Sequence, residues 1–276
     1  MSAPESCTDP AREVPASRID ILRPRNSRYA VLVFVINEGQ KVRGQIGRMH
    51  QDGAGIDVII ADGGSTDGSL DLGFLAENGV RALLTKIGPG KLSAQMRMGL
   101  AFAMDEDYDG VIVVDGNGKD DLRALPDFTR LLDDGYDHIQ GSRFIPGGHA
   151  VNTPLSRLIA LKVLHAPLIS LASRKRHTDT TNGFRGYSAR LILDPQIAVF
   201  RDIFTTYELH YHLAIESSRA ARFRTIETPV TRTYPATGKT PTKITPIRGN
   251  SHVLAVLFRA VLGRYRIPVS PGPTPR

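Results

Sequence analysis

The first half of the chain alternates short apolar runs with longer stretches of helical periodicity. Apolar runs of roughly four to eight residues between turn residues are typical of buried strands, and longer amphipathic stretches are typical of helices. The predicted strands cover residues 29–36, 57–61, 80–85 and 111–115, and the predicted helices cover residues 37–49, 69–78 and 91–104. Strands that alternate with helices pack as a mostly parallel sheet flanked by helices, so the pattern predicts an α/β fold.

The second half of the chain is less regular. It predicts helices over residues 125–134, 155–173, 207–220 and 251–263, and strands over residues 138–142 and 223–230. Residues 231–250 are rich in Pro, Gly and Lys, which predicts a mobile loop. We therefore expect a disordered leader (1–28), one domain (29–246) and a basic amphipathic helix with a tail (247–276).

The composition fits a folded domain without a disulfide framework. Hydrophobic residues make up 41% of the 276 positions, which suffices for a full core. The single cysteine, Cys7, lies in a polar segment, and this favours a reducing compartment. Because residues 1–28 lack the apolar core of a signal peptide, we expect a cytoplasmic protein.

The longest apolar stretch, residues 155–173, bears on membrane contact. A spanning helix needs about 20 predominantly apolar residues. This stretch is interrupted by four residues: Arg157, Lys162, His165 and Pro167. The pattern therefore argues against a spanning helix and leaves a peripheral contact at the inner membrane face, through this stretch or through the basic helix at residues 251–266.

The charge of the chain is positive but unevenly distributed. The net charge is +7, yet residues 101–140 hold eleven acidic against three basic residues, and residues 201–276 hold twelve basic against four acidic ones. An acidic middle with a basic last third fits a cation site that faces a phosphate-binding segment better than it fits a uniform DNA-binding face. Since no helix-turn-helix, zinc-finger or RNP-like pattern occurs, we expect no nucleic-acid partner.

Candidate chemistry is densest where the strand at residues 111–115 ends. Asp115 opens the run Asp-Gly-Asn-Gly-Lys-Asp-Asp, and ligands of open α/β sheets gather at such strand ends. Oxygen ligands at one-residue spacing suit hard cations such as Mg²⁺ or Mn²⁺, which proteins often share with nucleotide phosphates. The alternative is an acidic turn without a ligand.

A second polar run, Asp-Gly-Gly-Ser-Thr-Asp-Gly-Ser, begins at Asp62 at the end of another predicted strand. Asp62 could accept hydrogen bonds from a nucleobase, or the run could serve only as a turn and helix cap. It is not a Rossmann fingerprint. The run from Gly88 to Ser93 is not a Walker A loop, because Thr85 and Leu92 stand at required positions.

The order of these motifs resembles the family 2 glycosyltransferases of the GT-A fold. The resemblance rests on Val35-Ile-Asn-Glu38, the Asp62 run, Gly90-Lys91, Asp115-Gly-Asn117, Gln140-Gly-Ser-Arg143 and Asp179-Thr-Thr-Asn-Gly-Phe-Arg185, in this order. Later stretches, Tyr207-Glu-Leu209 and Pro229-Val-Thr-Arg232, are similar to dolichyl-phosphate or polyprenyl-phosphate mannose synthases. The resemblance covers residues 29 to about 245. It implies a Rossmann-like, mostly parallel sheet with a nucleotide-sugar half (29–121) and an irregular acceptor half (122–246).

The resemblance implies a donor site for a nucleoside diphosphate sugar. Its residues would be Val35, Asn37, Glu38, Asp62, Lys91, Asp115, Gly116 and Asn117. Asp115 and Asn117 would hold a divalent cation, Mg²⁺ or Mn²⁺, that neutralises the leaving diphosphate. Asn117 replaces the second carboxylate of the family's D-x-D pair, and Lys119 stands where the lipid-phosphate enzymes often have glutamine, so Lys119 could supply part of the positive charge.

The resemblance also implies a site for donor or acceptor phosphates. Its residues would be Lys119, Arg143, Asn182, Arg185, Arg232, Lys239 and Lys243. Arginines are suited to this role because they meet phosphate oxygens with two parallel hydrogen bonds. For Arg143 and Arg185 the alternative is an ion pair with a nearby acid, and for the three later residues it is a solvated basic loop.

The mechanism depends on the acceptor. A polyprenyl or dolichyl phosphate is already an anion and needs no general base, whereas a soluble sugar or secondary-metabolite hydroxyl needs a carboxylate such as Asp179 or Glu208. Glu208 could instead be a first-turn helix acid. With Asp115 these two acids complete the candidate catalytic residues, and a single displacement predicts inversion. The remaining alternative is a nucleotide-binding protein without transferase activity.

Overall fold

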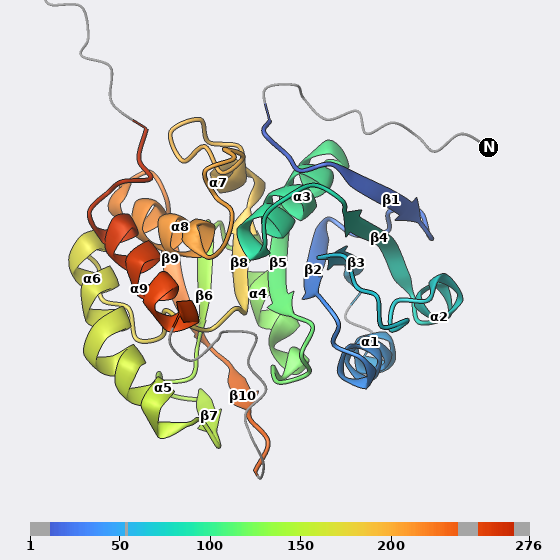
Figure 1. The fold of residues 1–276 in the computed structure, drawn as a ribbon, viewed down its shortest axis with the longest axis horizontal. Helices are drawn as coiled ribbons and strands as arrows, with labels where there is room; N and C mark the ends of the chain where they lie inside the picture. Colours follow the sequence, from blue (N-terminus) through green and yellow to red (C-terminus); the bar gives the residue numbers. More distant parts are fainter. Residues whose placement is uncertain (1–11, 53–54, 237–247, 268–276) are drawn as a thin grey trace, which may run out of the picture.

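The computed structural model describes residues 12–52, 55–236 and 248–267, and its centre is an eight-stranded sheet (Figure 1). The strand order is β1-β4-β3-β2-β5-β8-β6-β9. The bounds are β1 Ser17–Ile21, β2 Tyr29–Val35, β3 Asp57–Asp62, β4 Val80–Lys86, β5 Gly110–Asp115, β6 His138–Ser142, β8 Arg185–Ser188 and β9 Thr225–Pro229. Only β1 and β8 run antiparallel to their neighbours, so the predicted mostly parallel sheet is confirmed.

A small parallel sheet joins β7 (His149–Val151) to β10 (Thr231–Thr233). The helices are α1 Gln40–Asp52, α2 Leu72–Glu77, α3 Leu92–Asp105, the short 3₁₀ turn η1 Leu122–Ala124, α4 Leu125–Asp133, α5 Leu155–Ile159, the π-helical η2 Ala160–His165, α6 Ala166–Ser173, α7 Ala189–Ile192, α8 Glu208–Arg219 and α9 Arg248–Val261. Figure 1 shows β7 and β10 projecting at the lower edge, beside the loop that follows β5.

Successive side chains of a strand point to opposite faces of the sheet, so the buried side chains form two core layers, one on each face. On one face Leu32 of β2 packs in a cluster with apolar residues of α3, α6, α8 and α9. On the other face Val33 packs in a cluster with residues of α1, α2 and α4. Because both faces of the central strands are covered, β2 is buried at all of its positions, which explains its unbroken apolar run.

The chain reverses its direction of progress across the sheet between β2 and β5. From β2 it proceeds outward to β3 and β4, and it then returns to place β5 on the other side of β2. Ligands of open α/β sheets bind at such a switch point, outside the carboxyl ends of the strands. The ends of β2 and β5 therefore define where a site is expected, and Asp115 is the last residue of β5.

Three segments differ from the sequence-based expectations. The predicted disordered leader is wrong for residues 17–21, where the alternating Ile19 and Ile21 form edge strand β1 against β4. The mobile loop predicted from residue 231 begins instead with β10. Strand β8 was missed because its sequence, Arg-Gly-Tyr-Ser, has no apolar run, although it lies between β5 and β6 in the sheet centre.

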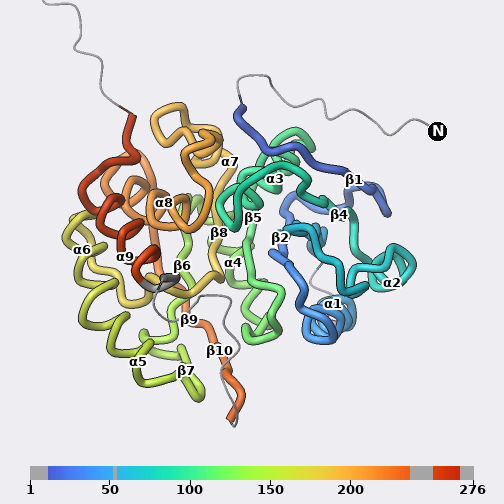
Figure 2. Tube along the Cα trace, in the orientation of Figure 1, coloured from blue at the N-terminus to red at the C-terminus, as the bar shows by residue number. Residues whose placement is uncertain are grey.

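The helical segment Leu155–Ser173 is the one segment of the described residues that is long and apolar enough, by length and composition, to cross a membrane. Only 28% of it is buried within the protein. Its outward face carries Leu155, Ile159, Val163 and Leu171. Its inward face meets α8 and includes the buried His165 and Ile169. Figure 2 shows the segment at the outer edge of the molecule, next to α9.

Candidate active site at the ends of strands β2 and β5

The candidate site is organised around Asp115. The loop after it is fixed by Gln45 of α1, which donates to the carbonyl of Asp115 (3.1 Å) and accepts from the backbone N–H of Gly118 (2.8 Å). A Cβ on Gly116 would lie 2.8 Å from Val35 and 2.9 Å from the carbonyl of Phe34, so only glycine permits this close approach to β2. The carboxylate of Asp115 remains 31% exposed.

Arg232 links Asp115 to a second acid of the same loop. Its guanidinium donates to Asp115 Oδ2 at 2.9 Å and to Asp120 Oδ2 at 2.5 Å. Backbone hydrogen bonds hold Arg232 there: Asp121 N–H donates to Thr231 and Thr233 N–H donates to Lys119, both at 2.9 Å. Strand β10 therefore crosses the predicted metal motif and pairs Arg232 with Asp120, an acid of the same run for which no separate role was predicted.

Charge and burial act in opposite directions on this cluster. Burial raises the pKa of Asp115, but the charge of Arg232 and its hydrogen bond lower it more, so the pKa lies below its usual value. For Asp120 burial prevails over the attraction of Arg232, and the pKa is raised. Burial lowers the pKa of Arg232, yet both acids raise it more, so this guanidinium stays charged.

Asn117 and Lys119 flank the carboxylate. Asn117 donates to Asp115 Oδ2 at 3.3 Å, and its own oxygen accepts from the backbone N–H of Lys119 at 3.3 Å. Burial, followed by the charge of Arg232, lowers the pKa of the Lys119 ammonium. Gly183 lies opposite: a Cβ there would be 3.1 Å from Asp115 Oδ1. Its missing side chain leaves room beside this oxygen.

Two predicted donor residues lie where neighbouring strands end: Asn37 is in the loop after β2, and Asp62 is the last residue of β3. Hydrogen bonds join the loops that follow the two strands. Asn37 has a left-handed backbone (φ 48°), which asparagine tolerates, and its side-chain oxygen accepts from Thr66 N–H at 2.8 Å. Asp62 is 3% exposed and accepts from the backbone N–H and the hydroxyl of Ser65. These bonds are the turn chemistry left open as an alternative for the Asp62 run.

Three more predicted donor residues have different degrees of exposure. Val35 is buried, and its carbonyl accepts from Gly63 and Gln95. Glu38 is partly buried at the start of the α1 region, and Lys91 is exposed where α3 begins. Of this group, Lys91 therefore has a side chain accessible to solvent at a helix N-terminus.

Arg143 and Asp179 form a closed ion pair. Arg143 Nε and Nη2 donate to the two carboxylate oxygens of Asp179 at 2.6 and 2.9 Å. The Asp179 side chain is fully buried and that of Arg143 is 3% exposed. The ion pair anticipated as the alternative for Arg143 is thus present, and Asp179 has no face on solvent from which to take a proton.

Arg185 and Asn182 are also placed as structural residues. Arg185 is 2% exposed and donates to the backbone carbonyls of Asn182, His210 and Thr180 at 2.8–3.0 Å. The structure thus places this guanidinium among carbonyls rather than at a phosphate. Asn182 is fully buried and accepts from the N–H of Phe184. Its Nδ2 has no partner among the described residues.

Glu208, the first residue of α8, binds the turn that leads into the helix. Its carboxylate accepts from the backbone N–H groups of Thr205 and Thr206, and from the Thr206 hydroxyl at 2.7 Å. With 5% of its surface exposed, it matches the first-turn acid left open as an alternative. Lys239 and Lys243 lie outside the described residues.

Sequence reasoning missed Tyr234 and Arg157. Tyr234 follows β10, and its ring lies 5.1 Å from Lys119 Nζ and 5.6 Å from the Arg157 guanidinium. Arg157, on α5, donates to the Tyr234 hydroxyl at 3.4 Å. Burial would raise the pKa of Tyr234, but Arg232 and the other cations lower it below its usual value. The fold therefore gathers three cations about one tyrosine, beside Asp115.

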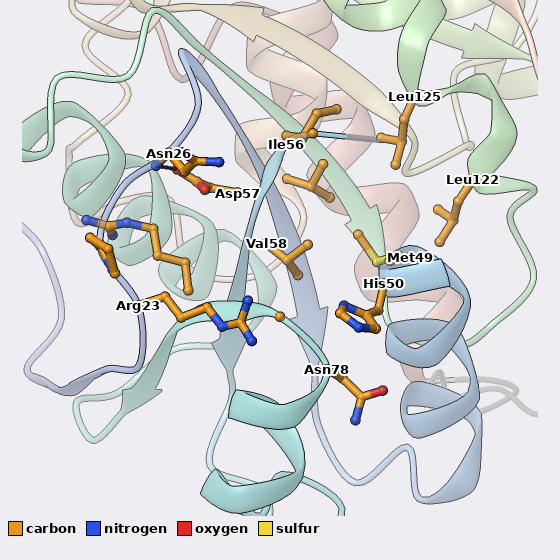
Figure 3. Close-up of a pocket in the computed structure, with 15 residues that line it drawn as sticks. Arg23, Asn26, Met49, His50, Ile56, Asp57, Val58, Asn78, Leu122 and Leu125 are labelled. Carbon is orange, nitrogen blue, oxygen red and sulfur yellow. Dashed lines mark hydrogen bonds between the residues drawn. The ribbon is translucent and has the colours of Figure 1, made fainter. Parts of the chain in front are cut away.

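The cavity in Figure 3 is a separate feature, of about 200 Å³. It is lined by Val31 and Val58 near the amino-terminal starts of β2 and β3, and by Met49 and His50 at the end of α1. Asp57 in its wall accepts hydrogen bonds from Tyr108 and two backbone N–H groups. This cavity lies at the opposite strand ends from Asp115, so it does not extend the candidate site.

No model of a protein family matches the chain, but curated proteins do. It is 27% identical to a polyprenol monophosphomannose synthase of Mycolicibacterium smegmatis, over 70% of this chain and 71% of that protein. It is 28% identical to an undecaprenyl-phosphate mannosyltransferase of Micrococcus luteus (74% and 83%). It is 25% identical to the glycosyltransferase AglJ of Haloferax volcanii (86% and 73%).

Solved structures show the same fold. Glucosyl-3-phosphoglycerate synthase of Mycobacterium tuberculosis, in complex with Mn²⁺ and UDP-glucose, superposes with a TM-score of 0.59 at 17% identity, over 90% of this chain and 86% of that one. Its UDP complex gives a TM-score of 0.57 at 18% identity, over 88% and 81%. The chain has the fold of the GT-A glycosyltransferases, and its predicted resemblance in sequence to the polyprenyl-phosphate mannose synthases is confirmed.

Proposed function

We propose that this protein is an inverting glycosyltransferase that moves a sugar from a nucleoside diphosphate sugar to a polyprenyl phosphate. The similar curated proteins support this activity class, and the carboxylate of Asp115 at the switch point of the sheet supports the position of the donor. The donor diphosphate would lie between Asp115, Lys119 and Arg232, beside the loops that hold Asn37 and Asp62.

A divalent cation fits this donor site if the nucleotide supplies most of its ligands. The described residues contain no cluster of three His, Cys, Asp or Glu that could hold a metal. The side-chain bonds described for Asp115 both reach Oδ2, and Oδ1 faces the space left by Gly183. Mg²⁺ is commonly held by one or two carboxylates plus phosphates and water. Asp115, with the Asn117 oxygen, would hold the ion, which would offset charge on the diphosphate.

One observation carries the choice of a phosphate acceptor over a hydroxyl. Both carboxylates predicted as general bases are engaged: Asp179 is fully buried against Arg143, and Glu208 accepts from the backbone N–H groups of the turn before α8. A hydroxyl acceptor needs a base within hydrogen-bond reach, whereas a phosphate is already a nucleophilic anion. The chemistry left to the protein is charge stabilisation and positioning, for which this site has several cations.

The acceptor phosphate would be held by the cations around Tyr234. Lys119 and Arg157 both approach its ring, and Arg157 also donates to its hydroxyl. Arg157 belongs to the helix segment Leu155–Ser173, whose outward face is apolar. A lipid phosphate has this combination of an anionic head and an apolar chain, so one helix would meet both parts.

The same helix segment supports a peripheral membrane contact at the cytoplasmic face. Leu155, Ile159 and Val163 are 69%, 52% and 73% exposed. Lys162 within the segment and the exposed cations Arg174 and Arg176 after it would face anionic lipid head groups. This arrangement would bring the acceptor to the site without withdrawing its chain from the bilayer.

The proposed reaction is one displacement at the anomeric carbon. An oxygen of the acceptor phosphate forms a bond to that carbon while the bond to the donor's diphosphate breaks, and the diphosphate leaves with the electron pair. Lys119 and Arg232 would stabilise the charge that develops on the leaving group. Attack from the face opposite the leaving group inverts the configuration.

The test incubates purified protein with labelled GDP-mannose or UDP-glucose, Mn²⁺, and either polyprenyl phosphate in detergent or a soluble sugar. We expect label in the lipid fraction with inverted configuration. Label only in the soluble sugar would favour the hydroxyl alternative, and retention of configuration would refute the single displacement. Binding of a nucleoside diphosphate without transfer to either acceptor would support the non-catalytic alternative.

A further inference from the structure

We propose that Arg232 is a built-in cation of the donor site, which occupies Asp115 when no donor is bound and which a divalent cation displaces from Asp115. This inference rests on the proposed function, because it concerns how the same site receives its donor. It makes Arg232 and the ion alternative partners of one carboxylate. It also makes Asp120 a positioning residue, which keeps Arg232 in place during the exchange.

The two acids that share Arg232 are not equivalent. The Asp120 side chain is 1% exposed, whereas that of Asp115 is 31% exposed. Arg232 itself is 8% exposed and uses different nitrogens for the two acids. A buried ion pair is costly to break because one charge is left uncompensated, whereas a partly exposed carboxylate can exchange its partner with solvent and ions. The pair with Asp120 is therefore the permanent one, and the pair with Asp115 is exchangeable.

The backbone keeps Arg232 within reach of both acids. Strand β10 forms an isolated antiparallel bridge, between Arg232 and Asp120, with the segment that follows the predicted metal motif. On its other side β10 pairs with β7 along its whole length. An exchange at Asp115 therefore requires only that the guanidinium turns while the strand stays in place.

The local charges show why an ion and Arg232 would compete. Asp115 and Asp120 carry two negative charges, and Arg232 and Lys119 offset them without any metal. An added divalent ion at Asp115 would stand close to a guanidinium 2.9 Å from the same carboxylate. Repulsion between like charges at such distances is strong in a partly buried site. The ion binds well only after Arg232 turns away, and Arg232 is then free to meet a donor phosphate.

The test measures Mn²⁺ binding without nucleotide, by the electron paramagnetic resonance signal of the free ion. The double variant Arg232→Gln/Asp120→Asn removes one positive and one negative charge, so Asp115 loses its competitor while the net charge is unchanged. We expect Mn²⁺ to bind at least about tenfold more tightly than to the unaltered protein. Equal or weaker binding in a folded double variant would overturn the inference.

A matched control removes an equivalent pair elsewhere. Arg222→Gln/Asp194→Asn deletes a bidentate ion pair (2.9 and 3.0 Å) that lies away from the β5 end and should leave Mn²⁺ binding unchanged. Tighter binding in this control as well would assign the effect to general charge changes and overturn the role of Arg232.

Two single variants keep the inference testable if the double variant does not fold. Asp120→Asn leaves Arg232 with Asp115 as its one acid partner in the cluster, so Mn²⁺ should bind several-fold more weakly. Arg232→Lys keeps the charge but loses the two-pronged geometry, and should bind Mn²⁺ more tightly than the unaltered protein. Tighter binding to Asp120→Asn, or no change in Arg232→Lys, would contradict the exchange.

Failure of this inference is distinguishable from failure of the proposed function. Sugar transfer by the unaltered protein, with no effect of Arg232 on Mn²⁺ binding, would remove only the exchange. The expected Mn²⁺ effects in a protein that transfers no sugar would keep the exchange and remove the transferase proposal.

Discussion

Two buried Arg–Asp constellations in this molecule differ in how completely their charges are matched. Arg143 and Asp179 form a one-to-one pair with two parallel hydrogen bonds, and neither side chain reaches solvent to more than 3%. Arg232 is shared between two acids, one of which remains 31% exposed. In the first arrangement, neither charged side chain is accessible to a ligand. The second has an accessible carboxylate and a cation with two alternative partners.

The difference indicates which constellation is structural and which is chemical. A closed pair fixes the loop that follows β6 against residues 179–181, and it supports the fold whatever is bound. A shared cation can change partners when an ion or phosphate arrives. Arg and Asp therefore serve different purposes in the two constellations, because the number of acids per arginine and the exposure of these acids differ.

The largest expected effect concerns the closed pair. Asp179→Asn leaves the buried Arg143 without a charged partner, and we expect the free energy of unfolding to fall by about 3–5 kcal/mol. Replacing both residues, as Arg143→Met/Asp179→Leu, should recover most of that loss. Urea denaturation measures both values. A loss below about 1 kcal/mol for Asp179→Asn would show that this pair does not support the fold.

The next effect concerns the exposed acid of the shared cluster. Asp115→Asn leaves Arg232 paired with Asp120, so we expect unfolding to change by less than about 1 kcal/mol. Turnover with a nucleotide sugar should fall about 100- to 1,000-fold, as when a charge-stabilising group is lost. Asp127→Asn, an exposed acid on α4, is the control. Unchanged turnover in Asp115→Asn would refute the site.

We expect the free energy of unfolding of the protein, with both constellations in place, to decrease at acidic pH. Burial lowers the pKa of His177 and His212 to about 4 and of His210 to about 3, so they stay neutral in the folded protein. The unfolded chain binds these protons near pH 6.5, so stability is complete above that pH and falls as the pH drops toward 4. We expect a loss of up to about 2 kcal/mol per histidine between pH 7 and 5.

Urea titrations at pH 7 and 5 measure this loss. In His212→Gln the glutamine amide can donate to the carbonyl of Ile197 in place of the imidazole. The loss of stability between pH 7 and pH 5 should then be smaller by the contribution of one histidine. If His212→Gln loses as much stability between pH 7 and pH 5 as the unaltered protein does, His212 does not contribute to this loss.

A smaller effect is expected for Glu208, whose role is either structural or that of a general base. Glu208→Gln weakens the hydrogen bonds from Thr205 and Thr206 to this side chain and should lower the free energy of unfolding by about 1 kcal/mol. Because this structural role involves no proton transfer, turnover should change little. Assays of turnover across pH separate the two roles, since a large loss of turnover together with loss of the acidic limb in the variant would restore Glu208 as a general base.

The smallest effect on stability is expected on the exposed face of the helix segment next to Arg157. Ile159→Ser/Val163→Ser changes exposed side chains, so unfolding should shift by no more than about 0.5 kcal/mol for each change. Sedimentation with anionic vesicles should show clearly weaker binding. Leu193→Ser, an exposed apolar residue beside α7, should bind as the unaltered protein does. Equal loss in both would indicate no specific membrane face.

The sequence predicted the parallel half of the fold well because its signal is local. The apolar runs of β2, β3, β4 and β5 exist because both faces of these strands are buried, and the order of strands and helices follows from short connections. Strands β7, β8 and β10 gave no such signal. They are three or four residues long and contain no apolar run of strand length, and pairing with distant segments stabilises them.

The residues of the candidate site likewise fall into those that the sequence predicted and those that it did not. Asp115, Gly116 and Asn117 were predicted as site residues from the sequence because a strand end, a glycine and two side chains with oxygen atoms are adjacent in the chain. Arg232 was predicted too, through its resemblance to a family motif. Its partners were not predicted, because Asp115 is 117 residues away in sequence and Asp120 carried no motif.

The sequence alone determined the α/β fold class, the position of the acidic loop after β5 and the resemblance to nucleotide-sugar transferases. Only the tertiary structure decided which charges are free to act. It enclosed Asp179 with Arg143, set Arg185 among backbone carbonyls, bonded Glu208 to the turn before α8 and left Asp115 partly exposed. The physical reason is that burial and partners fix the state of a charged group, and both depend on contacts between segments far apart in the chain.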